Sequence, residues 1–82
     1  MKELVEYIVK SLVDDPDAVS VTEVKGPGTT LLELSVAAPD MGRIIGKGGR
    51  IINSIRALLQ VPAAKKGTRV TLELLEADGG SR

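Results

Sequence analysis

The chain of 82 residues contains neither cysteine nor histidine. Without cysteine there is no disulfide framework and no thiolate metal site. Without histidine the usual general base of acid–base and nucleophilic catalysis is missing as well. These absences argue against an enzyme, and we expect no metal and no cofactor. Leu, Ile and Val, within a hydrophobic content of 43%, must supply the core.

Aromatic residues and long apolar runs are scarce too. Tyr7 is the one aromatic residue, so the strands lack the base-stacking aromatics of RNA-recognition motifs and OB-folds. No segment approaches the ~20 apolar residues of a membrane span. The first residues, "MKELVEYIVK", carry Glu3 and Glu6 within their apolar pattern, which is unlike a signal peptide. We therefore expect a cytoplasmic protein without a membrane partner.

The net charge is zero, but the two signs are separated along the sequence. Residues 41–69 contain no acidic residue, and all 11 acidic residues lie outside this segment. Its basic residues are Arg43, Lys47, Arg50, Arg56, Lys65, Lys66 and Arg69. This asymmetry indicates a basic face for a polyanion, unless the folded surface mixes the two sets.

Hydrophobic periodicity predicts an α+β domain with the order helix, strand, strand, helix, helix, strand. The expected ranges are a helix at 2–13, strands at 19–25 and 29–37, helices at 41–45 and 50–61, and a strand at 68–76. The first two strands form a hairpin, and the last is reached by a helical crossover and is expected to be parallel to the second. Three helices then cover one face of a three-stranded mixed sheet. Residues 1–76 form one domain, and 77–82 are expected to be a disordered tail.

Local signals refine the helical half of this prediction. Asp40 is the expected N-cap of the short helix, and Pro62 is expected to end the long helix, leaving 62–67 as a loop. The apolar stripe predicts the core residues Ile44, Ile51, Ile55 and Leu58, with Ile45 or Ile52 as the alternatives that line a groove.

The stretch "IIGKGGR" at 44–50 places a lysine in a glycine loop at the start of a helix. It is not a Walker A loop, because Gly42 precedes Gly46 by one position too few and Gly48 replaces the magnesium-binding Ser or Thr. It is not the dinucleotide fingerprint either, because Ile51 stands where the third glycine belongs.

The sequence "RIIGKGGRII" resembles the signature of KH domains, I-I-G-x-x-G-x-x-I, with Gly46 and Gly49 as the loop glycines. The helix-first order resembles the type II arrangement. The stretch "APDMGRIIGKGGRIINSIRALL" is similar to the KhpA family of small bacterial RNA-binding proteins with a single KH domain. The resemblance implies a type II KH fold, α-β-β-α-α-β, over residues 1–76.

The residues of the loop suit a phosphodiester. Gly46 and Gly49 let the backbone turn and let a phosphate approach, and the amides around Gly48, Gly49 and Arg50 are expected to be free donors at a helix N-terminus. Lys47 and Arg50 add positive charge. The resemblance implies a groove beside the loop, with the short helix on one side and the final strand on the other. The expected RNA-binding residues are Arg43, Ile45, Gly46, Lys47, Gly48, Gly49, Arg50, Lys65, Lys66 and Arg69.

These observations predict a protein that binds single-stranded RNA through a backbone clamp, as a post-transcriptional regulator or RNA chaperone. Arg56 is expected to be a solvated helix residue. The resemblance implies a homodimer or a heterodimer with a KhpB (Jag-like) KH protein, and "LLQVPAA" at 58–64 is the candidate contact. The alternative is a KH-shaped protein–protein interaction module that does not bind RNA.

Overall fold

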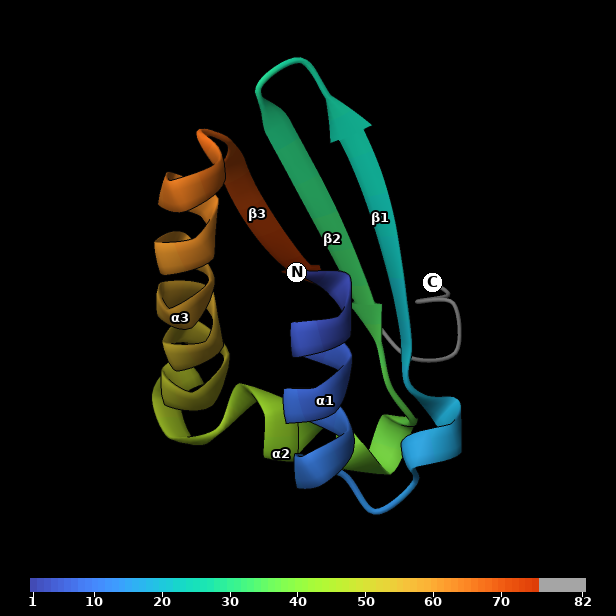
Figure 1. Ribbon diagram of the computed structural model, residues 1–82. Coiled ribbons are helices and arrows are strands. Elements are labelled where there is room, and N and C mark those ends of the chain that lie inside the picture. The colour runs from blue at the N-terminus through green and yellow to red at the C-terminus, as the bar shows by residue number, and fades with distance from the viewer. Residues whose placement is uncertain (76–82) are drawn as a thin grey trace.

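The structure is a computed structural model that describes residues 1–75 (Figure 1). Short 3-10 turns lie at Pro16–Ala18, Ala38–Asp40 and Lys47–Gly49. The predicted order of elements and the α+β fold class are confirmed. The predicted tail at 77–82, and residue 76 at the predicted domain end, lie outside the described residues. The main elements are α1 (Lys2–Leu12), β1 (Ser20–Gly26), β2 (Thr29–Ser35), α2 (Met41–Ile45), α3 (Arg50–Lys66) and β3 (Arg69–Leu74).

The three strands form one mixed sheet in the order β1-β2-β3. β1 and β2 pair as an antiparallel hairpin, and β2 and β3 pair in parallel, as the sequence predicts. The Arg69 amide donates to the Gly28 carbonyl at 2.9 Å, so β3 begins beside the hairpin turn. From there β3 runs along the free side of β2 toward the end of the sheet at which α2 lies (Figure 1).

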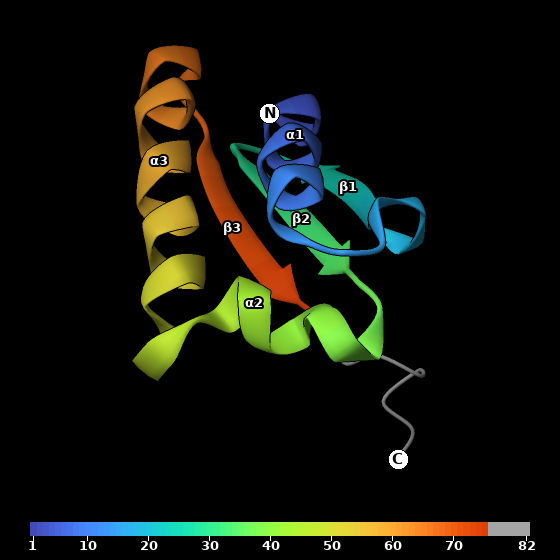
Figure 2. The same ribbon diagram turned by 90° about the horizontal axis from the view of Figure 1, so that it is seen from below.

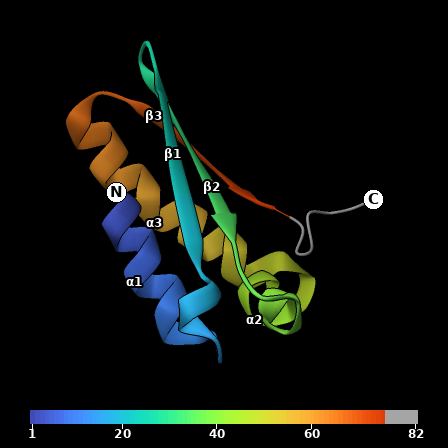
Figure 3. The ribbon, with the colours of Figure 1, turned by 90° about the vertical axis from the view of Figure 1, so that its right-hand side faces the viewer.

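The helices form a single layer on one side of the sheet. α1 and α3 lie side by side on the same face (Figures 1 and 3), and α2 lies across the end of this layer (Figure 2). Burying the apolar side chains of both layers supplies most of the stabilisation, because the chain has no disulfide. The buried core consists of Val5, Val9, Val21, Leu32, Leu34, Val36, Ile44, Ile52, Ile55, Leu59, Ala63, Val70 and Leu72.

The long helix α3 continues past Pro62, so the prediction that it ends at residue 61 with a loop at 62–67 is wrong. A proline inside a helix costs about 3 kcal/mol. Two features downstream offset this cost. Ala63 is buried in the core, and the amides of Gly67 and Thr68 donate to the carbonyls of Ala64 and Ala63. These two bonds form a Schellman cap, which Gly67 allows with a φ of 69°.

The buried face of α3 is centred on Ile52, Ile55 and Leu59. The core prediction is confirmed for Ile44 and Ile55, whereas Ile51 is only partly buried. It is wrong for Leu58, whose exposed fraction is 56%. Ile51 and Leu58 lie at the edge of this buried face, where Ile51 still packs against the core and Leu58 is exposed.

Asp40 occupies the predicted N-cap position of α2, but its side chain forms no capping hydrogen bond with that helix. Its carboxylate is buried, with an exposed fraction of 2%, and accepts hydrogen bonds at 3.1 Å from the amides of Asp14 and Asp15. These amides belong to the connection after α1, 25 and 26 residues away in sequence. Asp40 therefore ties this connection to the start of the segment that carries the glycine loop.

Candidate nucleic-acid interface

The glycine loop lies at the junction of α2 and α3, at the lower end of the molecule in Figure 1. Three of its residues adopt positive φ angles: Gly46 at 73°, Gly48 at 65° and Gly49 at 81°. Residues with a Cβ are uncommon in this region, so the loop conformation depends on glycine. The result is an exposed turn that enters α3 directly.

Gly46 is required by packing as well as by backbone conformation. A Cβ at this position would lie 2.6 Å from Cγ1 of Ile51, which is partly buried against the core. A Cβ at Gly49 would meet only the Asn53 side chain, at an ordinary 3.6 Å. Both glycines are expected from the sequence to have the same role, but the structure distinguishes them.

Of the three loop amides expected to be free donors, Gly48 is free, whereas Gly49 and Arg50 are bonded within the loop. The Gly49 amide donates to the Gly46 carbonyl at 3.3 Å, and the Arg50 amide donates to the Lys47 carbonyl. By contrast, the amides of Lys47 and Gly48 have no hydrogen-bond partner within residues 1–75. These two adjacent N–H groups, both at exposed residues, are therefore the free donors for an anion.

The side chains at the loop add charge and an apolar surface. Lys47 at the loop tip and Arg50 in the first turn of α3 are both exposed. The N-terminal end of α3 carries the positive end of the helix dipole, which favours an anion at the same place. Ile45, just before the loop, is exposed, whereas its neighbour Ile44 is fully buried. Ile45 is thus positioned to contact a ligand, and Ile44 to hold α2 in the core.

Arg43 is engaged elsewhere, although the sequence analysis includes it among the RNA-binding residues. Its NH2 group donates to Asp14 Oδ2 at 2.9 Å, and its Nε lies 3.5 Å from Asp40 Oδ1. Two carboxylates therefore offset the charge of this guanidinium. A phosphate contact by Arg43 stays a prediction, and it would have to compete with both pairs.

Arg56 is exposed, as expected of a solvated helix residue, but it also contacts β3. Its Nε donates to the Leu72 carbonyl at 3.1 Å, and its NH1 donates to Asn53 Oδ1 at the same distance. Gln60, one turn further along α3, lies 3.5 Å from the Val70 carbonyl. β3 is an edge strand, and these side chains approach its free edge. The spacing 53, 56, 60 forms a polar stripe beside the buried one, a signal that the sequence contains.

The remaining predicted residues lie at the other end of α3. Lys65 and Lys66 occupy its last turn, and Arg69 begins β3 beside the hairpin turn. α3 has 17 residues, so about 25 Å separates these cations from the loop. Apart from Arg56 in the middle of α3, the basic residues of the segment therefore form two clusters, one at each end of the helix. Contacts of Lys65, Lys66 and Arg69 with RNA stay predictions.

Residues 1–75 contain neither a candidate membrane span nor a candidate metal site. No helix within residues 1–75 is long and apolar enough to cross a membrane. The same residues contain no group of three or more acidic, histidine or cysteine side chains that could hold a metal ion.

Comparison with known families and proteins identifies relatives over nearly the whole chain. Residues 2–74 match the family model described as "KhpA/KhpB, KH domain". The "RNA-binding protein KhpA" of Chlamydia pneumoniae is 53% identical over 76 residues, which cover 93% of this chain and 97% of the relative. The proteins of the same name from Clostridium acetobutylicum and Borreliella burgdorferi are each 51% identical. Those alignments cover 92% and 90% of this chain, and 100% and 90% of the relatives. No solved structure matches the chain significantly.

Proposed function

The chain belongs to the KhpA/KhpB KH-domain family, and on this basis we propose that it binds single-stranded RNA by clamping the sugar-phosphate backbone at Gly46–Gly49. The observation that carries this proposal is the pair of unpartnered amides at Lys47 and Gly48. Both amides lie at the start of α3, next to the exposed cationic side chains of Lys47 and Arg50. A loop of this kind in a KH domain holds about four nucleotides.

The bases would lie beside the loop, between Ile45 on α2 and the free edge of β3. Ile45 offers an aliphatic surface, and Arg56 holds its guanidinium at the strand edge through the Leu72 carbonyl. Since Asn53 and Leu72 occupy NH1 and Nε, the NH2 group of Arg56 remains for a base or phosphate oxygen. This groove needs no aromatic residue, which agrees with a chain whose one aromatic residue lies on α1.

RNA binding through phosphates makes the affinity depend on salt. We expect the logarithm of the association constant to fall linearly with the logarithm of the salt concentration. Lys47→Ala should make that slope shallower by roughly 0.7 to 1 unit, because one phosphate contact is lost. Fluorescence anisotropy of a labelled single-stranded RNA between 50 and about 200 mM salt measures both slopes. Lys10→Ala, an exposed lysine on α1, is the control and should leave the slope unchanged. A wild-type slope near zero would contradict the clamp.

Pairing of two protomers is the second part of the proposal, since one clamp on a few nucleotides binds modestly and two raise the effective concentration. α3 presents an apolar stripe to solvent, with Leu58 exposed to 56% and Val61 to 60%. The small residues Ala57 and Ala64 are exposed on the same side. We propose that this stripe forms a two-fold contact in a homodimer, or the contact with a KhpB (Jag-like) protein.

Val61→Asp should convert the homodimer to a monomer, because the substitution buries a carboxylate in the contact. The melting temperature should fall only modestly, since Val61 is exposed in the protomer. Sedimentation velocity at micromolar concentration measures the state of association. Val24→Asp makes the same change at a half-exposed valine of β1 and should leave the dimer intact. A wild-type protein that sediments as a monomer would remove the homodimer from the proposal.

The proposed role is that of a post-transcriptional regulator or RNA chaperone without catalysis, and an RNA ligand implies a cytoplasmic place of action. The alternative is a KH-shaped module that binds only protein. The exposed Lys47 and the unpartnered amides favour RNA, because an acidic or bulky loop tip would suit the alternative better. Failure of the wild-type protein to bind any single-stranded RNA at low salt would favour the protein-binding module.

A further inference from the structure

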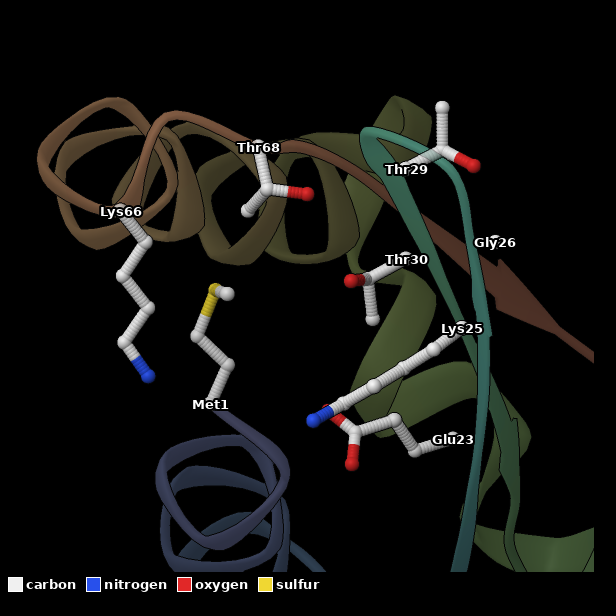
Figure 4. Close-up of a pocket in the computed structure, with 8 residues that line it drawn as sticks. All are labelled: Met1, Glu23, Lys25, Gly26, Thr29, Thr30, Lys66 and Thr68. Carbon is white, nitrogen blue, oxygen red and sulfur yellow. The ribbon is translucent and has the colours of Figure 1, made fainter.

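A pocket of about 260 Å³ lies at the end of the molecule opposite the glycine loop. It lies between the start of α1, the end of α3 and the hairpin end of the sheet (Figure 4). The clamp does not use this pocket, and its lining residues come from β1, β2, α3, the chain start and the connection between α3 and β3. Those that matter here are Met1, Glu23, Lys25, Thr30, Lys66 and Thr68.

Thr30 is the residue that marks the pocket as a site. It occupies a core-facing position of β2, in register with Leu32 and Leu34, and its exposed fraction is 7%. Its hydroxyl points into the pocket in Figure 4 and forms no side-chain hydrogen bond with any residue of the described chain. No buried side-chain nitrogen or oxygen within residues 1–75 lacks a partner, so the Thr30 hydroxyl is open to the pocket, where a water or a ligand oxygen completes its hydrogen bonding.

The charges around Thr30 favour an anion. Lys25 on β1 and Lys66 on α3 line the pocket from opposite sides (Figure 4). α1 begins at Lys2 beside the pocket, so the positive end of that helix dipole lies near it. Glu23 is the one carboxylate in the lining, which leaves the lysines in excess.

The rest of the lining suits a ligand that is larger than a bare ion. Met1 contributes an apolar thioether wall, and Thr68 a second hydroxyl at the rim (Figure 4). Hydroxyls and the Glu23 carboxylate can bond to sugar hydroxyls, while lysine ammonium groups bind phosphate. The volume of about 260 Å³ lies just below the range of about 300 to 1,000 Å³ that holds drug-sized ligands, so it suits a single mononucleotide and nothing longer.

We propose that this pocket is a second ligand site, which binds a phosphate-bearing group of nucleotide size. The phosphate lies between Lys25 and Lys66, and the Thr30 hydroxyl donates to one of its oxygens. The ligand has two sources with the same chemistry: a free nucleoside phosphate, or a nucleotide of an RNA that is longer than the four held by the clamp. The proposal does not depend on the clamp, because about 25 Å of α3 separates the two sites.

The test is titration of the isotope-labelled protein with uridine 5′-monophosphate, with uridine as the ligand that lacks the phosphate. Amide NMR signals of Gly26, Thr30 and Thr68 should shift with the monophosphate and not with uridine. Thr30→Val keeps the side-chain shape and Lys66→Gln removes one charge, so each should weaken binding by about tenfold. Glu23→Gln should strengthen it. Lys10→Gln, the matched loss of an exposed charge outside the pocket, should have no effect.

A second arm separates the two sources. If the ligand is part of an RNA, Lys25→Gln should weaken binding of an eight-nucleotide RNA and leave that of a four-nucleotide RNA unchanged. If the ligand is a free nucleotide, Lys25→Gln should weaken binding of the monophosphate and leave the affinity for both RNAs unchanged. Absence of shifts at the pocket amides together with equal RNA affinities would overturn the proposal. Equal shifts with uridine would also overturn the proposal. If Thr30→Val does not fold, the affinities of Lys66→Gln and Glu23→Gln for the monophosphate still test it. Loop variants should leave all pocket responses intact, so a failed clamp and a failed pocket are distinguishable.

Discussion

A protein with Lys47→Asp and Gly48→Asp should lose affinity for single-stranded RNA by at least about 100-fold and retain its fold. The two substitutions replace the exposed cation at the loop tip by a carboxylate and add a second carboxylate beside it. Both carboxylates would face the phosphate at the two unpartnered amides. A loss of this size corresponds to about 2.7 kcal/mol, which is modest for the reversal of a charge at a phosphate contact.

The fold should survive because neither side chain is needed for packing. Lys47 and Gly48 are exposed, and a Cβ at Gly48 meets no atom within 4 Å. The φ of 65° at Gly48 is unfavourable for most residues, but aspartate is among those that tolerate this region. The expected cost is about 1 to 2 kcal/mol. Fluorescence anisotropy with a labelled RNA measures the affinity, and circular dichroism checks the fold.

The control is Lys10→Asp with Gly28→Asp. It makes the same change in charge and places an aspartate at another glycine with positive φ and open space around it. Neither position belongs to the loop, so this variant should lose only the affinity that follows from net charge. Normal RNA binding by the loop variant would exclude the loop as the site. An equal loss in both variants would replace the local clamp by a non-specific effect of charge.

The features that the sequence predicts well are those with local physical causes. The bounds of α2 and the position of the glycine loop follow from residues that adjoin one another, from Met41 to Gly49. The β1–β2 hairpin follows from period-two alternation on both sides of a Gly-Pro-Gly turn. Each of these signals acts within one element, so a reading of that element alone finds it.

The features that the sequence does not predict depend on contacts between distant residues. Aspartate is a residue type typical of helix N-caps, yet the carboxylate of Asp40 accepts hydrogen bonds from amides that precede it by about 25 residues. Proline usually ends a helix, yet α3 continues past Pro62, because Ala63 is buried in the core and Gly67 caps the helix further on. Local propensity is a weak term that tertiary contacts override.

The site prediction divides in the same way. The loop residues from Gly46 to Arg50 lie together because they are consecutive, whereas Lys65, Lys66 and Arg69 lie at the far end of α3. A count of charges along the sequence does not show where each cation lies. Because α3 extends to Lys66, its last cations lie one helix length away from the loop. The contact of Arg56 with β3 is not predictable from the sequence either, because it depends on which strand edge α3 faces in the fold.

Gly46→Ala should be among the most destabilising substitutions in the loop, at about 3 to 5 kcal/mol. Its φ of 73° and ψ of 179° fall in a region that is essentially limited to glycine, and its Cβ would lie 2.6 Å from Ile51. Gly49→Ala is the matched variant: its φ of 81° is also positive, but its Cβ would make an ordinary contact of 3.6 Å with Asn53. It should cost only about 1 to 2 kcal/mol. Urea unfolding with equal m-values measures both. Equal destabilisation would show that Ile51 yields freely, and that Gly46 is needed for its backbone angles alone.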